Sequence, residues 1–226
     1  MKGLYQFVAA LAICLATPSV MADKLPDTTH DGLARVPDTK VEAVYMRPGA
    51  DLGEYDKIAM LEAYVAFRKN WQRDQNRQAM TLSERISDED MQKIRDALAQ
   101  EFATIFADEL VTKGGHTLVK EGGAGVLILR PAIVNLDIAA PDTMSAGRSR
   151  SYTTTSGQMT LYLELYDGLT GDIIARIVDP KAIDDGFIHY TNRVTNKADA
   201  DRILRRWARL LNEHLAEVKS QDGKDG

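Results

Sequence analysis

Arginine and hydroxyl side chains gather in one loop of the chain, where they could hold an anion. Arg148, Arg150 and Tyr152 lie in a stretch of residues 148–155 that is rich in serine and threonine. Two guanidinium groups beside several hydroxyls can bind a carboxylate, a phosphate or a sugar. The stretch is also long for a connection between strands, and such loops are often functional. We predict a ligand or partner site at these three residues, with a solvated surface loop as the alternative.

A second basic group has helical spacing near the C-terminus. Four arginines recur at i, i+3, i+4 and i+7 and form one ridge on a predicted helix: Arg202, Arg205, Arg206 and Arg209. This arginine ridge is the alternative partner face, suited to lipid headgroups or an acidic protein. A solvated helix face, partly paired with neighbouring acids, is the other interpretation.

Catalytic chemistry has one weak candidate. Asp184, Asp185 and His189 stand close in the sequence and could serve a hydrolase as carboxylates and a proton acceptor. The four histidines show no i, i+4 pair and no His-Glu-x-x-His pattern, and no serine lies in a nucleophile motif. We therefore predict no metal, no cofactor and no catalytic residues, and favour a protein that is not an enzyme.

The N-terminus has the three parts of a secretory signal. Lys2 is followed by an apolar run over residues 4–16, and Val20-Met21-Ala22 supplies compact residues at the cleavage site. An uncleaved anchor is the alternative, but the run is short for a membrane span, which needs roughly 20 residues. We predict a signal peptide over residues 1–22, cleavage between Ala22 and Asp23, and a periplasmic mature chain.

Cys14 is the only cysteine and leaves a second possibility open. Leu11 stands three residues before it, as in a lipid-attachment motif, whereas Ile13 directly before it is bulkier than the usual small residue. A membrane-anchored lipoprotein through Cys14 is therefore the alternative. Cleavage after Ala22 instead leaves a mature chain without cysteine, which must be stabilised by packing alone.

Composition limits the partners. The 226 residues are 44% hydrophobic and carry a formal net charge of −5. This is enough apolar material for one sizeable core. The acidic balance argues against nucleic acid as a partner. Membrane association stays possible, but not as a transmembrane protein.

A hairpin over residues 157–183 is the strongest structural signal. Met159, Leu161, Leu163 and Leu165 alternate with polar residues, as they do in a strand with one buried face. Glycines at 168 and 171 suit the loop, after which apolar residues alternate again. Closing the loop between Asp167 and Gly171 predicts that Leu165 lies opposite Ile173.

Two amphipathic helices accompany the strands. The first begins at Ser87, which can cap it, and ends at Gly114-Gly115. The second covers residues 197–219. Strands are expected at 41–47, 117–120 and 126–138, and residues 55–67 fit a strand or a helix. We predict an α+β fold: a two-layer domain with a mainly antiparallel sheet and two long helices packed on one face.

The expected organisation has four parts. Residues 1–22 are the signal peptide, 23–40 a flexible N-terminal arm, 41–219 a single α+β domain and 220–226 a disordered tail.

Several of these motifs also resemble a known family. They are Tyr55-Asp56-Lys57 before an apolar strand, Ser87-Asp88-Glu89 at a helix start, Gly125-Val126-Leu127, and the hairpin from Glu164 to Gly171. Together they resemble a bacterial family of unknown function whose members are described as envelope lipoproteins. The resemblance implies an envelope location and brings no catalytic residues with it.

These observations favour an exported bacterial envelope protein that is a non-catalytic binding or assembly module, in the periplasm or at the outer membrane. Its partner would be an envelope protein or an anionic ligand. A periplasmic hydrolase with a carboxylate/histidine site is the alternative.

Overall fold

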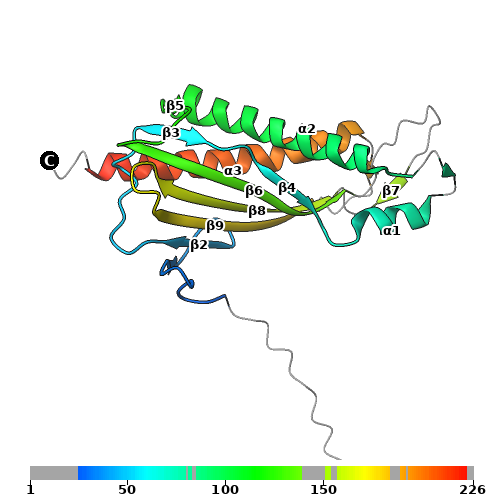
Figure 1. The fold of residues 1–226 in the computed structure, drawn as a ribbon, viewed down its shortest axis with the longest axis horizontal. Coiled ribbons are helices and arrows are strands. Elements are labelled where there is room, and N and C mark those ends of the chain that lie inside the picture. The colour runs from blue at the N-terminus through cyan, green and yellow to red at the C-terminus, as the bar shows by residue number, and fades with distance from the viewer. Residues whose placement is uncertain are drawn as a thin grey trace, which may run out of the picture.

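The computed structural model describes residues 25–79, 81–82, 85–138, 151–153, 157–183, 189–191 and 193–222. An eight-stranded sheet forms one layer and two long helices form the other (Figure 1). The helices are α2 (Asp88–Ala107), which continues as the π-helix η2 (Asp108–Lys113), and α3 (Arg193–Asp222). A shorter helix, α1 (Trp71–Gln78), lies at one end. The predicted α+β fold is confirmed.

The sheet order is β1-β2-β9-β8-β6-β3-β5, and β4 pairs with β6 beyond the end of β3. The strands from β1 to β6 in this order are antiparallel, whereas β3, β4 and β5 run parallel to their neighbours. The strand bounds are Ala34–Val36 (β1), Ala43–Met46 (β2), Lys57–Met60 (β3), Tyr64–Phe67 (β4), Thr117–Val119 (β5), Val126–Ile138 (β6), Gly157–Asp167 (β8) and Ile173–Ile183 (β9). A separate pair joins β7 (Ser151–Thr153) to β10 (His189–Thr191).

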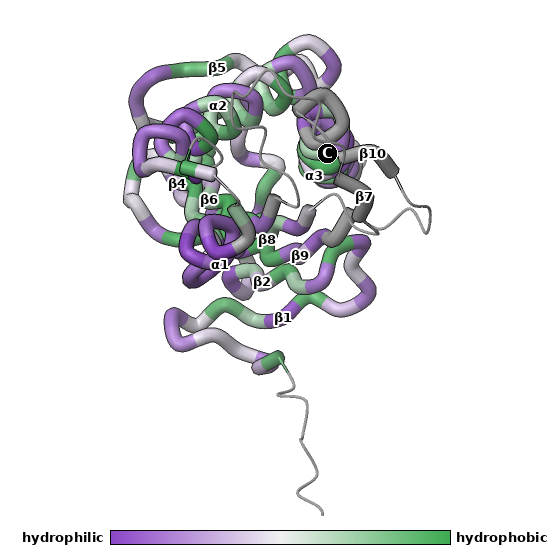
Figure 2. Tube along the Cα trace, turned by 90° about the vertical axis from the view of Figure 1, so that its right-hand side faces the viewer, coloured by the Kyte–Doolittle hydropathy of each residue, from purple (hydrophilic) through white to green (hydrophobic). Residues whose placement is uncertain are grey.

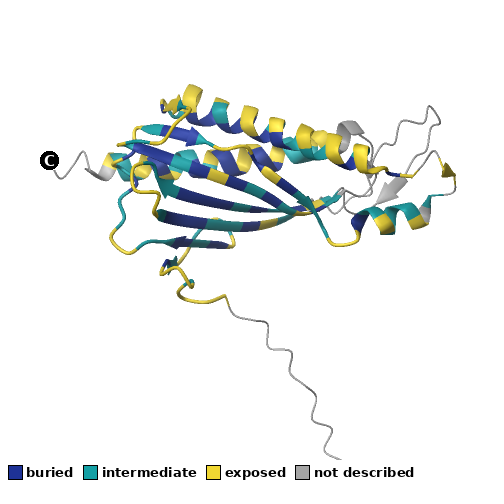
Figure 3. Ribbon diagram, viewed as in Figure 1, coloured by how far each residue is buried: buried dark blue, intermediate teal, exposed yellow. Residues whose placement is uncertain are grey.

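The core lies between the sheet and the two helices, which run over the same face (Figures 1 and 2). Phe102 and Phe106 of α2 stack with ring centroids 3.9 Å apart, and both are fully buried. Trp207 of α3 is buried in the same cluster, which also contains leucines of β6 and β8. Buried residues follow the strands and the inner sides of the helices (Figure 3), because a two-layer fold hides one face of each element.

The hairpin has the predicted inner face but a different register. Asp167 pairs with Asp172 across the loop, and Leu165 lies opposite Ala175 rather than Ile173. A bulge at Ile174 accounts for the difference, because the extra residue returns Ala175 and the residues after it to the core face. The expected register was therefore wrong by two residues: the loop closes one residue later than expected, and the bulge adds one more. A shift of two residues keeps each side chain on the same face of the strand, so the predicted buried face is still correct.

The helix boundaries follow local chemistry. The Ser87 side chain accepts a hydrogen bond from the Asp90 backbone N–H at 3.1 Å, and the Asp90 carboxylate accepts one from the Ser87 N–H at 2.9 Å. This capping box starts α2 where the sequence predicts it. At the other end, η2 stops at Gly114, where a Cβ would lie 2.2 Å from Oδ1 of Asn212. Glycine is required there because α3 approaches too closely for a side chain.

The outer face of the sheet is partly covered by chain that precedes β2. Within the predicted N-terminal arm, Ala34–Val36 form β1, and Leu33 is fully buried beside Ala43 and Tyr45. Residues 55–67, for which the sequence left strand and helix open, form β3 and β4. In the described part of the chain, no helix is long and apolar enough to cross a membrane.

Candidate functional site

The predicted loop site is only partly described. Arg148 and Arg150 lie outside the described residues. Tyr152 lies in β7, where its backbone pairs with Tyr190 of β10. Of the hydrolase candidates, Asp184 and Asp185 are also outside the described residues, and His189 lies in β10 opposite Thr153. Residues 151–153 of the predicted binding loop therefore pair through their backbone with residues 189–191, which include the histidine of the hydrolase alternative.

The arginine ridge is exposed along α3. Arg202 contacts Asp199 at 2.6 Å, and Arg209 lies 3.7 Å from Glu213. Arg206 instead donates a hydrogen bond of 3.1 Å to the backbone carbonyl of Lys40. Neither Arg205 nor Arg206 has a carboxylate partner among the described residues, so part of this ridge is free to meet an anion.

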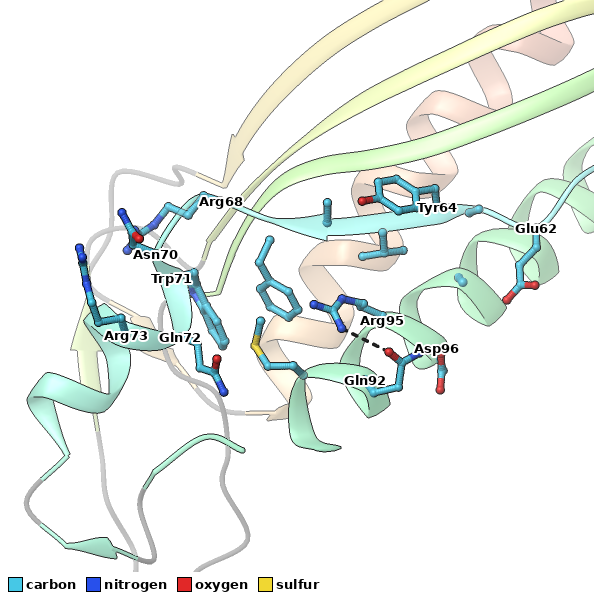
Figure 4. A pocket seen from close by; sticks show the side chains of 16 residues that line it. Glu62, Tyr64, Arg68, Asn70, Trp71, Gln72, Arg73, Gln92, Arg95 and Asp96 are labelled. Carbon is cyan, nitrogen blue, oxygen red and sulfur yellow. Dashed lines mark hydrogen bonds between the residues drawn. The ribbon is translucent and has the colours of Figure 1, made fainter. Parts of the chain in front are cut away.

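A groove that the sequence did not predict lies at the end of the sheet near α1 (Figure 4). It has a volume of about 880 Å³, and β4, the start of α1 and the first turns of α2 form its walls. β4 pairs with β6 on one side, and no described strand pairs with its other edge. Every residue from Glu62 to Arg68 lines the groove, so the unpaired strand edge borders it over its whole length.

Aromatic side chains make one wall of this groove. Phe67 and Trp71 stack with ring centroids 4.4 Å apart, and Trp71 is buried at the first residue of α1. Tyr64 is 65% exposed, which is unusual for a large ring. Such amphipathic rings offer contact area at little entropic cost, and they are enriched where proteins bind one another.

The groove also holds charge. Arg68 is fixed by Asp74 at 2.9 Å and by Asp137 at 2.6 Å, and hydrogen bonds to these carboxylates raise its pKa. Arg95 extends from α2 toward β4 (Figure 4), with its Cζ 5.6 Å from the centroid of the Phe67 ring. Its one hydrogen bond to a side chain is 3.2 Å, to Oε1 of Gln92, and no described carboxylate pairs with it. Arg95 is therefore the cation best placed to bind an incoming acidic group.

One residue, Trp71, is the only mark of this groove in the sequence. Residues 68–85 read as a polar loop or a frayed helix start, because they are mostly charged and amide side chains. The single tryptophan in that stretch marks the place where α1 packs. Asn76 holds the following segment, accepting from the Ile86 N–H at 2.7 Å and donating to the Ile86 carbonyl at 3.0 Å.

A buried charge cluster on the outer face of the sheet is a second feature that the sequence did not predict. Arg176 of β9 contacts Glu164 of β8 at 2.9 Å and Asp31 at 2.6 Å, and both Arg176 and Glu164 are buried. Burial raises the pKa of Glu164, but hydrogen bonds from Tyr166 and Arg176 outweigh it, so the net direction is down. Hydrogen bonds from Arg176 and Thr29 hold the pKa of Asp31 well below its usual range. All three charges are satisfied, so the cluster clamps the N-terminal segment to the sheet.

The register explains why the sequence alone does not predict the pair of Glu164 and Arg176. Glu164 lies directly opposite Arg176, whereas the register expected from the sequence places Ile174 there. Cross-strand ion pairs can be read from a sequence only when the register is right.

Three of the four histidines have side chains that the structure describes, and their surroundings differ. His30 and His214 are exposed, whereas His116 is buried and its pKa is lowered by burial and by Lys219. Across the described ranges, no three histidine, cysteine, aspartate or glutamate side chains are close enough together to hold a metal ion.

The chain is an α+β protein with a groove beside an unpaired sheet edge. The chain belongs to the family described as protein of unknown function (DUF3313), whose profile matches residues 26–211. No curated protein matches the chain significantly.

Among solved structures, two crystal forms of a PelC dodecamer from Paraburkholderia phytofirmans are similar, one of them with a leucine-to-methionine substitution. Each is 11% identical, with a TM-score of 0.36. The alignments cover 75% and 74% of this chain and 95% of the PelC chains.

Proposed function

We propose that this protein is a non-catalytic binding module of the bacterial envelope, and that the groove beside β4 takes an extended segment of a partner protein. The observation that carries the proposal is the unpaired edge of β4, which borders an aromatic groove along its whole length. An exposed strand edge presents unpaired backbone groups that a peptide can complete by adding one strand.

The side chains around the edge favour a particular kind of segment. Tyr64 and Phe67 supply apolar and aromatic contact, with buried Trp71 stacked behind Phe67, and this favours an apolar residue on the partner. Arg95 favours an acidic residue, because a guanidinium beside an aromatic ring binds a carboxylate with charge-assisted hydrogen bonds. The partner segment is therefore extended, with an acidic and an apolar side chain close together.

Export of the chain rests on the N-terminal sequence. The apolar run and Val20-Met21-Ala22 support cleavage before Asp23 and release into the periplasm. Fractionation followed by mass measurement of the intact mature chain tests this. A chain beginning at Asp23 in the soluble periplasm is the expected result, and a lipid-modified Cys14 in the membrane fraction would replace it with the lipoprotein alternative.

Site-specific cross-linking tests the binding proposal in cells. A photoreactive amino acid at Tyr64 should capture one defined partner, because this side chain stands beside the strand edge. The same amino acid at Leu169, which is 70% exposed in the loop between β8 and β9, is the matched control. Equal adducts at both positions, or none at Tyr64, would count against the groove.

A synthetic peptide that covers the captured segment then separates strand addition from simple contact. Two versions of this peptide carry N-methyl groups, one on the odd-numbered and one on the even-numbered residues. If the peptide adds a strand, one version should lose binding and the other should keep it, because only alternate N–H groups point to the neighbouring strand. Arg95→Gln should weaken binding by about tenfold, as expected for the loss of one charge-assisted hydrogen bond. Lys93→Gln, on the exposed side of α2, should leave binding unchanged.

A further inference from the structure

One buried histidine lies away from the groove beside β4 and has no part in the proposed peptide site. His116 is 4% exposed and follows the two glycines that end η2. Its backbone N–H donates to the Leu110 carbonyl at 3.0 Å, which fixes its position at the end of that helix. Neither residue lines the groove. An inference about this histidine therefore stands apart from peptide binding.

The imidazole of His116 meets the last turns of α3. Its Nδ1 atom lies 3.5 Å from Nζ of Lys219. An ammonium group can only donate, so Nδ1 accepts and the imidazole is neutral in this arrangement. Figure 1 shows the C-terminal end of α3 at the same end of the molecule as β5, the strand that begins directly after His116. The contact therefore joins the end of the last helix to the corner between η2 and β5.

The charges around this imidazole oppose its protonation. From α3, Lys219 brings a like charge, and β5 carries no charged residue. From the turn before β3, Asp56 acts in the opposite direction, but its carboxylate is 71% exposed and lies 3.8 Å from Lys57. On η2, Glu109 and Lys113 pair with each other at 2.6 Å. Burial and the ammonium group therefore lower the pKa of the histidine, and the exposed carboxylate offsets them only in part.

The helix end that carries Lys219 is held by few contacts. Beyond the buried Leu215, Val218 is the one described apolar residue that packs against the core cluster, and it is only half-buried. The side chains between and after them are exposed: Ala216, Glu217 and Ser220. A helix end with few buried contacts opens at a low free energy, without unfolding of the core.

We propose that His116 is an acid-sensitive switch for the end of α3. While the imidazole is neutral, it accepts from Lys219 and holds the helix end against the corner between η2 and β5. When it is protonated, two cations face each other across 3.5 Å, and the turns after Leu215 separate from the corner so that water reaches both charges. Acid thus uncovers this corner and leaves the rest of α3 on the sheet.

The sign of the pH dependence follows from the lowered pKa of His116. In the open form the imidazole has its ordinary pKa of about 6.5, so the open form binds the proton more readily than the closed form. The contact stabilises the closed form fully above about pH 6.5 and loses this contribution as the pH falls further. Asp31 and Glu164 take up protons only below about pH 4, so the two effects lie in separate ranges.

Hydrogen exchange of the backbone amides at pH 7.5 and pH 5.5, corrected for the intrinsic exchange rate, tests the switch. Protection after Leu215 should fall several-fold and by at most about tenfold, because an imidazole with a pKa of about 6.5 is about nine-tenths protonated at pH 5.5. Peptides around Trp207, in the middle of α3, should keep their protection and serve as the internal reference. Equal losses in both regions, or no loss at the helix end, overturn the proposal.

Two variants separate the histidine from its neighbour. His116→Gln keeps an acceptor for Lys219 but takes up no proton in this range, so the fall in protection should disappear. Lys219→Met keeps an apolar stem and removes the like charge, so the closed form accepts a proton more readily and the fall should be smaller. His214→Gln alters an exposed histidine on the same helix and is the matched control, which should keep the full fall. The full fall in His116→Gln contradicts the switch.

A titration of the unmodified protein keeps the test decisive if a variant does not fold. Imidazole resonances followed by NMR should give His116 a midpoint below about 6.5, the ordinary value for histidine. The resonances of the Lys219 side chain should shift with the same midpoint, because the two groups are in contact. A midpoint for His116 at or above the ordinary value overturns the proposal.

Discussion

Asp179 of β9 accepts a hydrogen bond of 2.7 Å from Nε1 of Trp207 and so joins the sheet to α3 inside the core. The carboxylate is fully buried, and it also accepts from the Glu42 backbone N–H at 3.1 Å and lies 3.0 Å from Lys181 Nζ. Three donors thus converge on one buried carboxylate, which is the acceptor for the indole N–H, the Glu42 N–H and the Lys181 ammonium group.

Removing this carboxylate should destabilise the domain. Asp179→Ala leaves the indole N–H, the Glu42 N–H and Lys181 without their acceptor, at a cost of about 2–4 kcal/mol. Urea unfolding of the mature chain measures the loss. Trp207→Phe, which removes one donor and keeps an aromatic ring, should cost less. The control Asp56→Ala alters a carboxylate whose side chain is 71% exposed and should stay within about 0.5 kcal/mol.

The two faces of β8 should respond differently to a new charge. Leu163→Asp places an unpaired carboxylate at a site that is 1% exposed and should cost roughly 3 kcal/mol or more. Tyr162→Asp, on the opposite face at a half-buried site, should cost less, because water can still reach a carboxylate there. Thermal unfolding of both variants gives the comparison. Equal losses would contradict a core on one face of the sheet.

The clamp around Arg176 should make the domain sensitive to acid. The folded-state pKa values of Asp31 and Glu164 are both lowered, so the unfolded chain binds protons more readily. Stability from these groups is complete above the unfolded carboxyl values of about 4 and falls as the pH drops further. Unfolding free energies measured between pH 7 and pH 2 should show this fall.

Arg176→Met tests the cause of that acid sensitivity. Without the guanidinium, only the Tyr166 hydrogen bond and the Arg130 charge still oppose the burial that raises the pKa of Glu164, so this variant should lose stability at neutral pH and gain relative to the wild type in acid. Parallel curves for the variant and the wild type would mean that other carboxylates dominate. Arg130→Met is a milder control, because its contact with Glu164 is longer, at 3.4 Å, and its side chain is 63% exposed.

The end of η2 should tolerate no side chain at Gly114. A Cβ there would lie 2.2 Å from Asn212 Oδ1 and 2.6 Å from the Leu110 carbonyl oxygen, so Gly114→Ala should cost about 1–3 kcal/mol through overpacking. Gly115→Ala meets no atom within 4 Å and suffers only the strain of its φ of 71°, about 1–2 kcal/mol. Combining Gly114→Ala with Asn212→Ala should recover part of the loss in a double-mutant cycle. Additive effects would show that the two residues do not meet.

The sequence by itself determined the elements whose cause is local. Ser87 and Asp90 start α2 because a capping box needs only four residues, and the alternation from Met159 to Leu165 defines a strand and its buried face. Two amphipathic helices and a hairpin-rich chain then predict a two-layer α+β domain, because each element must bury its one apolar side.

Only the tertiary structure decided the features that join distant segments. The bulge at Ile174 set the register, and with it the pairing of Glu164 with Arg176, because alternation fixes the face of a strand but not its partner residue. The groove beside β4 arises where α1, α2 and an unpaired edge meet, and no spacing in the sequence encodes that meeting. The width of that groove likewise depends on how far α2 and α1 stand from β4, which is set by the packing of all the side chains between them.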